Sequence, residues 1–350
     1  MSAPVGFGFV GCGGAALSVA QAIGRSEVAT LTATLDLDRG LAAEVAGPFG
    51  ARVHERLDDL LADPGAEAVY VALPHRLLAP TAELVLAAGR AALVEKPMAL
   101  DLGAITRLDD LARDRGLALG VMFELRATGP ALVARDLVRD GTIGSVTCVR
   151  MRTLIDKPFA YWRSGYSDRV RSAWRARRDE AGGGVVLMNA IHQIDVLRMV
   201  THLELLEVSG VAGTLVADPG LVEVEDTAAA VFRMSNGAIG SLAAGAHVAG
   251  MAEGETIEID GTQGSLRMPD LYGSGECSVF LRRAWGGLPA GEWTNVPSPP
   301  ADPFRATIDA FATAVRDHRP APLGATEAAA ALGVVLDLYA SAAPIATGRT

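Results

Sequence analysis

The sequence predicts two domains: an α/β domain built on a doubly wound parallel sheet, and then an α+β domain built on a mostly antiparallel sheet. The 350 residues exceed the length of a typical single domain, and half of them are hydrophobic, so a large core is expected. Up to about residue 122, short aliphatic segments alternate with longer amphipathic ones, as in a parallel sheet covered by helices. Beyond that point, strand-like segments separated by turn residues dominate. We therefore expect domains at residues 1–122 and 123–350.

The strands expected in the first domain are apolar along their whole length, because helices cover both faces of a doubly wound sheet. Five segments fit this description: residues 5–10, 31–35, 68–73, 91–94 and 117–121. Two amphipathic segments between them, residues 80–88 and 102–115, are expected to be helices.

The second domain is expected to contain hairpins, because turn residues such as Ser-Asn-Gly at 235–237 and Asp-Gly-Thr at 260–262 separate its strand-like segments. The expected strands are residues 146–154, 207–216, 228–234, 238–244, 255–260 and 278–282. The expected helices are residues 130–139, 188–200, 304–316 and 326–342. Residues 286–303 are rich in Pro and Gly, which predicts a surface loop.

Composition disfavours several classes of protein. The net charge is −10, and the basic residues are scattered apart from a small cluster at 169–178, so nucleic-acid binding is not expected. Cys12, Cys148 and Cys277 lie far apart in the sequence, which predicts neither a zinc site nor a disulfide framework and favours a reducing cytoplasm. We expect no metal, no basic leader and no membrane-spanning segment.

A glycine-rich segment, Gly-Cys-Gly-Gly-Ala-Ala at 11–16, directly follows the first expected strand and opens a helix. Gly11 would allow the tight turn, Gly13 would let the backbone approach a pyrophosphate, and Ala16 would let the helix pack closely on the strand. Amides at the start of the helix would bind phosphates. The alternative is a plain glycine-rich turn.

Asp36 at the end of the second expected strand favours the dinucleotide site. It lies roughly 20 residues beyond the glycines, where a carboxylate accepts hydrogen bonds from the adenosine ribose hydroxyls. The same carboxylate would repel a 2′-phosphate, so NAD is preferred, while nearby Arg39 leaves NADP possible. Asp38 is expected to start the following helix.

Two further strands end in residues suited to chemistry. Leu73-Pro74 ends one, and Glu95-Lys96-Pro97 ends the next, so both would lie where ligands collect in a parallel sheet. A lysine there hydrogen-bonds a substrate hydroxyl and assists its deprotonation. The alternative is a lysine whose charge simply reaches solvent.

These motifs occur together with several others: "VALP" at 71–74, "VEKP" at 94–97, "GTIG" at 141–144, "GGGVVLMNAIHQID" at 182–195, "VEDTAAAVF" at 224–232 and "GTQGSL" at 261–266. In this order they make the chain resemble the Gfo/Idh/MocA oxidoreductases, which include inositol 2-dehydrogenase and glucose-fructose oxidoreductase. The resemblance covers nearly the whole chain. It implies a Rossmann domain, a C-terminal domain with a large open sheet, and NAD(P)-linked hydride transfer at a secondary alcohol or ketone of a carbohydrate-like substrate.

The resemblance also implies residue roles. His192 falls on the family's histidine, which binds the reacting hydroxyl and works with Lys96. Many members carry an aspartate four residues earlier, where this chain has Met188 beside Asn189, so a proton relay through that aspartate is absent. Trp174 and Arg175 correspond to residues near the nicotinamide and the substrate.

The candidate residues form three sets. The catalytic pair is Lys96 and His192. The substrate-binding set is Lys96, Arg126, Trp174, Asn189 and His192. The cofactor-binding set is Gly11, Gly13, Gly14, Ala16, Asp36, Leu73, Pro74, Glu95, Lys96, Trp174 and Arg175. Alternative acid/base groups are His75 and the tyrosines of residues 161–166.

Two other functions fit the same sequence. One is a non-catalytic NAD-binding sensor or partner subunit, suggested by Met188. The other is an enzyme that recycles a tightly bound NAD. Whatever its function, we expect the protein to form a homodimer or homotetramer, because the segments 228–234 and 239–246 carry apolar or small residues on both faces.

Overall fold

The computed structural model describes residues 3–250, 254–269, 271 and 275–344. Contacts divide the chain into two units. Unit 1 consists of Met1–Glu124, Ala160–Gly182 and Asp302–Ala329, and unit 2 consists of Leu125–Phe159, Gly183–Ala301 and Ala330–Thr350. Two segments that the sequence placed beyond residue 122, 160–182 and 302–329, thus belong to unit 1.

Unit 1 contains a six-stranded parallel sheet with the order β3-β2-β1-β4-β5-β6. The strands are β1 Val5–Val10, β2 Ala29–Leu35, β3 Arg52–His54, β4 Ala68–Val71, β5 Ala91–Glu95 and β6 Leu119–Met122. The expected doubly wound sheet is confirmed, and this order is that of a Rossmann fold. The three-residue strand β3 escaped prediction because it is short and bears two polar residues. The strand order reverses between β1 and β4, where such sheets bind ligands.

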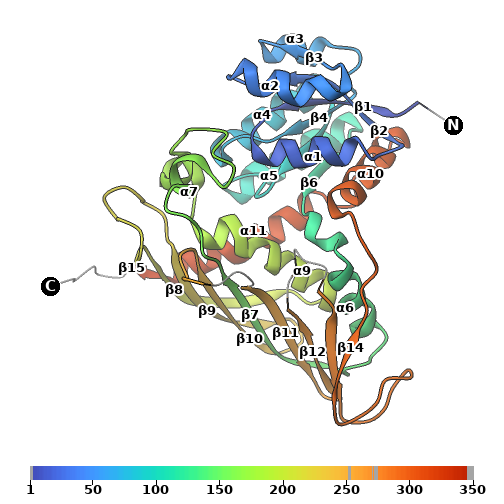
Figure 1. Cartoon of the computed structure of the whole chain (residues 1–350), viewed down its shortest axis with the longest axis vertical. Helices are drawn as coiled ribbons and strands as arrows, with labels where there is room; N and C mark the ends of the chain where they lie inside the picture. Colours follow the sequence, from blue (N-terminus) through green and yellow to red (C-terminus); the bar gives the residue numbers. More distant parts are fainter. Residues whose placement is uncertain (1–2, 251–253, 270, 272–274, 345–350) are drawn as a thin grey trace. The chain divides into compact units, whose positions relative to one another are not determined.

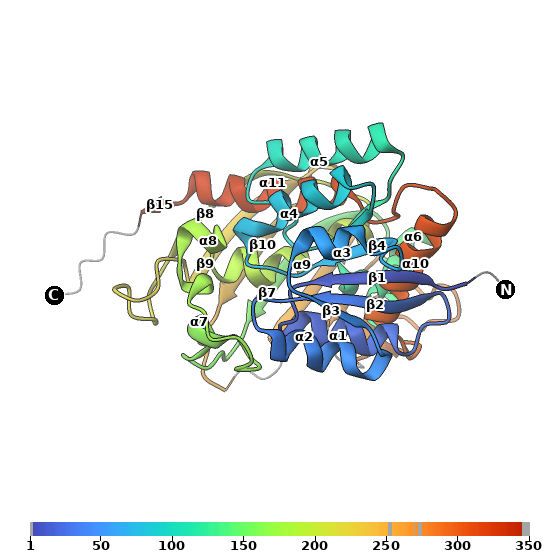
Figure 2. The same cartoon turned by 90° about the horizontal axis from the view of Figure 1, so that it is seen from above.

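Helices cover both faces of this sheet. They are α1 Gly14–Ile23, α2 Arg39–Ala46, α3 Leu57–Ala62, α4 His75–Ala87, α5 Leu102–Arg115 and α10 Pro303–Arg316. Figure 2 shows α1 and α10 on one face and α4 and α5 on the other. Phe7 of β1 lies 6.1 Å from Phe311 of α10, measured between ring centroids. A helix from the far end of the sequence therefore completes the core of the first sheet.

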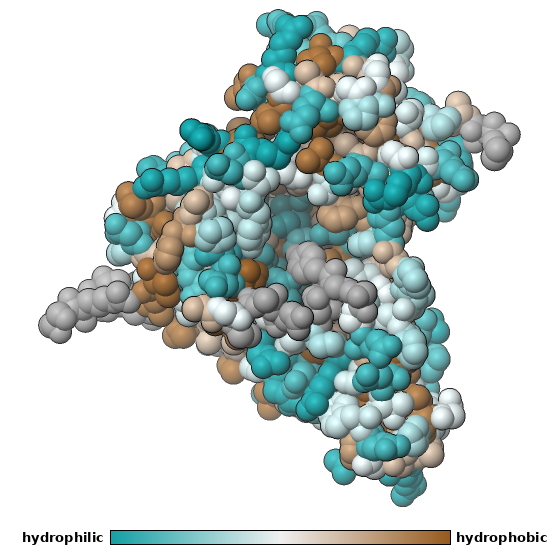
Figure 3. Space-filling model, in the orientation of Figure 1, coloured by the Kyte–Doolittle hydropathy of each residue, from teal (hydrophilic) through white to brown (hydrophobic). Residues whose placement is uncertain are grey.

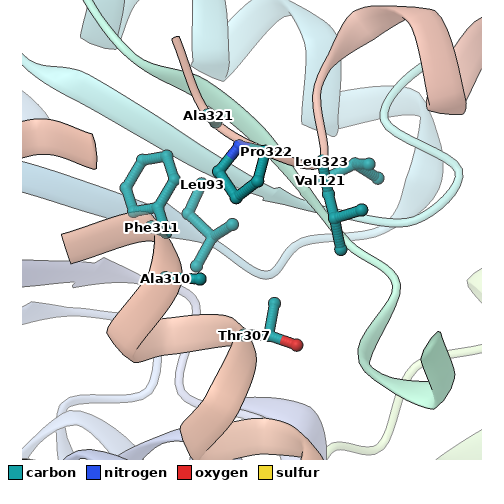
Figure 4. Close-up of a pocket in the computed structure, with 8 residues that line it drawn as sticks. All are labelled: Leu93, Val121, Thr307, Ala310, Phe311, Ala321, Pro322 and Leu323. Carbon is teal, nitrogen blue, oxygen red and sulfur yellow. The ribbon is translucent and has the colours of Figure 1, made fainter. Parts of the chain in front are cut away.

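The contact of α10 with β5 and β6 is tight. A Cβ atom at Gly120 would lie 2.7 Å from the ring of Phe311, so only glycine fits there. A cavity of about 30 Å³ remains between α10 and the two strands, lined by the residues in Figure 4. This volume is close to that of one water molecule, and the lining is mostly apolar. The cavity is therefore a packing feature.

Unit 2 contains a nine-stranded sheet with the order β14-β13-β12-β11-β7-β10-β9-β8-β15. The strands are β7 Val146–Leu154, β8 Leu205–Gly213, β9 Thr227–Met234, β10 Ile239–Gly245, β11 Glu255–Gly261, β12 Gly264–Met268, β13 Cys277–Leu281, β14 Trp293–Val296 and β15 Ala343–Pro344. All neighbours are antiparallel except β7 with β10 and β8 with β15, which confirms a mostly antiparallel sheet. The loop prediction for residues 286–303 is wrong at β14, because pairing with β13 satisfies its backbone.

One face of this sheet carries helices, as Figure 1 shows. They are α6 Gly129–Arg139, α9 Ile191–Thr201 and the later part of α11 Ala325–Ser341. A π-helical turn, Val186–Ala190, runs directly into α9. None of the helices in the described ranges is long and apolar enough to cross a membrane.

The start of the π-helical turn is anchored by a buried carboxylate. Glu225 accepts hydrogen bonds from the backbone N–H of Gly184 at 2.8 Å and of Val186 at 3.1 Å, and from the hydroxyl of Tyr339 at 2.7 Å. Burial raises the pKa of Glu225, while these donors oppose that rise. A Cβ atom at Gly184 would overlap the carbonyl oxygen of Glu225. The glycine is therefore needed to bring the two backbones together.

We predict that Gly184→Ala destabilises unit 2 by about 3 kcal/mol or more, because backbone rather than a flexible side chain must move. Urea unfolding followed by circular dichroism measures this. Gly333→Ala in α11 is the matched control: nothing lies near a Cβ there, and alanine favours a helix interior. Equal unfolding midpoints for the two variants would contradict the prediction.

Candidate active site

The glycine turn between β1 and α1 has the geometry of a dinucleotide-binding turn. Gly11 has a φ of +92°, and a Cβ atom there would overlap the carbonyl oxygen of Ala72. Its N–H donates to the carbonyl of Leu35 at 2.9 Å. Ala16 is fully buried, as close packing of α1 on the sheet requires. The tight turn expected at Gly11 and the close packing expected at Ala16 are therefore present.

Asp36 at the end of β2 is tied to the glycine turn. Its Oδ2 accepts the backbone N–H of Cys12 at 2.7 Å, and its Oδ1 accepts that of Asp38 at 2.8 Å. Each carboxylate oxygen keeps a further acceptor site, so the side chain is held in place while still able to accept from a ligand. Asp38 caps α2 by accepting from Gly40 at 2.8 Å, as the sequence predicted.

Residues 160–182 fold against the glycine turn within unit 1. A Cβ atom at Gly13 would lie 3.5 Å from Val170, and one at Gly14 would lie 3.1 Å from the hydroxyl of Ser167. Arg169 in this segment donates from Nη1 to Glu44 at 2.6 Å. Its Nε and Nη2 are buried and have no hydrogen-bond partner among the described residues.

These features fit a dinucleotide. Buried guanidinium N–H groups are costly unless they find acceptors. Besides Arg169, Nη1 of Arg175 is also buried without a partner in the described part of the chain. Such groups suit phosphate or amide oxygens. In the described ranges, no group of three or more His, Cys, Asp or Glu residues could hold a metal ion.

β5 ends at Glu95, and Lys96 follows it directly. The hydroxyl of Tyr70 donates to Glu95 at 2.5 Å, and Tyr70 is fully buried. Burial raises the pKa of Glu95, and the charge of Lys96 and the Tyr70 hydrogen bond oppose this. The Glu95 side chain is therefore held by Tyr70 directly before Lys96.

The turn that carries Lys96 is tight. The N–H of Met98 donates to the carbonyl of Glu95 at 2.9 Å, and Met98 has a φ of +66°, rare for a residue with a side chain. Met98 is fully buried. A strained and buried backbone at this point holds Lys96 in a defined place.

His75, at the start of α4, is a neutral neighbour of Lys96. Its Nδ1 lies 2.8 Å from the carbonyl oxygen of Ala181, which only accepts, so Nδ1 carries the proton. Burial lowers the pKa of His75 to about 3, and the charges of Lys96 and Arg175 add to this effect. The uncharged Nε2 is therefore left as an acceptor.

Trp174 and Arg175 belong to the same cluster. The ring of Trp174 meets that of His75 edge to face, with centroids 4.7 Å apart. The guanidinium of Arg175 lies 4.6 Å from the centroid of Trp174 and 5.4 Å from that of Tyr161. The structure thus brings these two predicted residues together with His75.

Unit 2 carries the other predicted residues on the π-helical turn and α9. His192 is buried in the first turn of α9, and Met188 is buried before it. Asn189 is the one partly exposed residue between 183 and 197. Its Oδ1 accepts a hydrogen bond from Nζ of Lys157 at 2.5 Å. The π-helical turn sets which way these side chains face.

Arg126 makes a bidentate ion pair with Asp195 of α9. Its Nε and Nη2 donate to Oδ2 and Oδ1 at 2.7 and 2.6 Å, and the Asp195 side chain is 1% exposed. These are the two N–H groups that a bidentate substrate contact would use. The geometry makes Arg126 a residue that positions α9.

Several contributors were not singled out from the sequence: Tyr70, Lys157, Arg169 and Glu225. Tyr70, Arg169 and Glu225 contact residues that are distant in the sequence, so no local sequence pattern marks them. Lys157 could have been found from the sequence, because only two of the 31 Lys and Arg residues are lysines, and the other is Lys96.

Comparison with known proteins identifies the class. Residues 5–123 match the model described as an oxidoreductase family with an NAD-binding Rossmann fold, and residues 131–267 match that of the GFO/IDH/MocA C-terminal domain. The chain belongs to the GFO/IDH/MocA family of oxidoreductases.

Individual relatives are distant. The 1,5-anhydro-D-fructose reductase of Ensifer adhaerens is 28% identical over 293 residues, 83% of this chain and 81% of that protein. The levoglucosan dehydrogenase of Pseudarthrobacter phenanthrenivorans is 28% identical over 248 residues, 65% of this chain and 61% of that protein. The crystal structure of the WlbA dehydrogenase from Bordetella pertussis, with NADH and UDP-GlcNAcA, has a TM-score of 0.81 at 23% identity and covers 98% of this chain and 96% of that one. This last likeness shows the shared fold.

We predict that His75 makes the protein less stable in acid. The unfolded chain binds a proton at His75 with a pKa near 6.5, whereas the folded chain does so only near 3. Protonation therefore favours unfolding, and the stabilisation is lost as the pH falls below about 6.5. Between pH 7 and 5 this loss amounts to about 2 kcal/mol.

Urea unfolding at pH 7 and at pH 5 measures the effect. His75→Asn should reduce the difference in free energy of unfolding by about this amount. His318→Asn is the matched control, because His318 is exposed and lies two residues beyond the end of α10. If the free energy of unfolding of His75→Asn depended on pH as strongly as that of the unaltered protein, the prediction would be refuted.

Proposed function

We propose that this oxidoreductase transfers hydride between NAD and the carbon of a secondary alcohol or ketone on a sugar, cyclitol or related carbohydrate. The observation that carries the proposal is Lys96, held at the end of β5 between an anchored Glu95 and a neutral His75. It lies in the sheet whose glycine turn and Asp36 fit a dinucleotide. The sugar substrates in the names of the relatives support the substrate class. The substrate screen below tests whether the substrate is like that of inositol 2-dehydrogenase or glucose-fructose oxidoreductase.

The residues have distinct roles in this proposal. Bound NAD supplies the group that accepts or donates the hydride. Lys96 hydrogen-bonds the substrate oxygen and exchanges its proton, and His192 binds the same hydroxyl. Trp174 and Arg175 border the nicotinamide end. Met188 has no proton to exchange, so Lys96 and His192 must act without a neighbouring carboxylate.

We predict that Lys96→Met leaves NAD affinity nearly unchanged but lowers kcat by roughly 10² to 10⁴, as expected for a lost acid/base group. A screen of sugars, inositols and their keto forms, followed by NADH absorbance, supplies the substrate, and calorimetry supplies the affinity. His192→Ala should lower kcat similarly and also raise KM. Turnover by the unaltered protein would also rule out the sensor hypothesis.

Arg76→Met is the matched control, because Arg76 is an exposed cation on α4 directly after His75. It should retain the kcat of the unaltered protein. Near-normal turnover in Lys96→Met would instead assign the proton transfer to another group, such as His192 or a tyrosine of residues 161–166.

We further propose that NAD binds more tightly than NADP, because the Asp36 carboxylate would repel a 2′-phosphate. Asp36→Asn keeps an acceptor for the N–H of Cys12 and removes the charge. It should narrow the ratio of the two dissociation constants by about tenfold, measured by calorimetry. NADP binding as tightly as NAD to the unaltered protein would sink this preference.

We also propose a homodimer or homotetramer formed through the helix-free face of the nine-stranded sheet. Val211, Val231 and Ile239 are each more than half exposed there, and a hollow of about 660 Å³ is lined by β7 to β10. Figure 3 shows apolar residues along the lower left margin, where β8 to β10 run in Figure 1. Analytical ultracentrifugation at micromolar concentration should show the oligomer, and Val231→Glu should weaken it. A monomer in the unaltered protein would exclude this interface.

A further inference from the structure

The scarcity of lysine singles out Lys157. Arginine occupies every basic position of this chain except two, and those two are Lys96 and Lys157. Both are preceded by an acidic residue and followed by proline. An exposed basic residue works equally well as arginine, so a retained lysine indicates a site that needs a compact ammonium group.

Lys157 lies inside unit 2 and is rigidly held. It is 2% exposed, which is unusual for lysine because burying its charge is costly. Its N–H donates to the carbonyl of Ala246 at 2.8 Å, and its carbonyl lies 2.8 Å from Nδ1 of His247. The ring of Phe159 stacks on that of His247, with centroids 4.5 Å apart. The backbone on both sides of the lysine is therefore fixed.

The ammonium group determines the orientation of Asn189. An asparagine amide presents an acceptor oxygen at one end and two N–H donors at the other. The ammonium of Lys157 only donates, so the end of Asn189 that faces it at 2.5 Å must be Oδ1. The N–H groups of Nδ2 are then the end that remains for a ligand.

We propose that Lys157 is a positioning residue that makes Asn189 a donor-only contact for substrate. This inference rests on the proposed function and deepens it. Asn189 is partly exposed, three residues before His192, whereas the residues from 183 to 197 around it are buried. The contact selects a substrate oxygen that only accepts: a keto, ether or carboxylate oxygen next to the reacting carbon. A hydroxyl at that place would have to find another acceptor for its own proton.

This polarity narrows the substrate class to keto sugars, anhydro sugars and sugar acids. A sugar with hydroxyl groups at every ring carbon is disfavoured, because a donor-only contact favours an oxygen without a proton. The substrate names of the two curated relatives, 1,5-anhydro-D-fructose and levoglucosan, provide probes that contain such oxygens.

The two lysines allow a direct test by nuclear magnetic resonance. Protein labelled with ¹³C at the lysine Cε positions should give two lysine signals, assigned with Lys96→Met and Lys157→Met. NADH should shift the Lys96 signal. Adding 1,5-anhydro-D-fructose or levoglucosan to the NADH complex should then shift the Lys157 signal, and myo-inositol should shift it less.

Kinetics test whether Lys157 acts through Asn189. Lys157→Met should raise KM for the anhydro sugar roughly tenfold to a hundredfold, with a smaller change in kcat. In an Asn189→Ala background the same substitution should change KM less than twofold, because the group it orients is gone. Gln193→Met is the matched control: Gln193 is a buried neighbour whose side chain donates to the carbonyl of Arg152 at 2.8 Å.

The outcomes separate the two proposals. A Lys96 signal that does not respond to NADH refutes the proposed function and this inference with it. A Lys96 response with a Lys157 signal unmoved by either anhydro sugar overturns the inference alone. Additive effects of Lys157→Met and Asn189→Ala on KM would also overturn the inference. The same holds if Lys157→Met loses stability, as Gln193→Met does, but leaves KM unchanged.

Discussion

Burying a charged group without a partner costs several kcal/mol, and this cost organises both units. Glu95 is held by Tyr70, Glu225 by two backbone amides and a tyrosine, and Asp195 by a bidentate arginine. Glu95 directly precedes Lys96, and Asp195 lies three residues after His192. Glu225 accepts a hydrogen bond from the π-helical turn that carries Asn189. Satisfying the buried charge and positioning the site are therefore the same structural requirement.

The environment of Lys96 follows from the same rule. A second cation close to Lys96 would be unfavourable, and buried His75 avoids that penalty by remaining neutral. The carbonyl of Ala181 fixes the proton of His75 on Nδ1, which leaves an acceptor nitrogen. Residues 160–182 thus shape the chemistry of the first unit, although they follow its last strand by nearly 40 residues.

The accuracy of the sequence predictions depended on whether the physical cause was local. The glycine turn, Asp36 and the apolar strands are set by backbone conformation and periodicity within a few residues, and the structure shows them where they were expected. β14 escaped prediction because its stability comes from β13 rather than from its own Pro-rich and Gly-rich surroundings. The first three residues of the helix expected over 188–200 belong instead to a π-helical turn, whose start is anchored by the hydrogen bond from Gly184 to Glu225.

By itself, the sequence determined the fold class, the family, the dinucleotide turn and the lysine at the end of β5, because each depends on residue type and short-range spacing. Only the tertiary structure decided which residues complete these features. It placed α10 on the first sheet and Lys157 in hydrogen-bond contact with Asn189. It also paired the Nε and Nη2 groups of Arg126 with Asp195, so these two donors are not left for a ligand. Those contacts join residues 32 positions apart (Lys157 and Asn189) to 304 positions apart (Phe7 and Phe311), and their free energy comes from burial and from polar pairing, which no local pattern records.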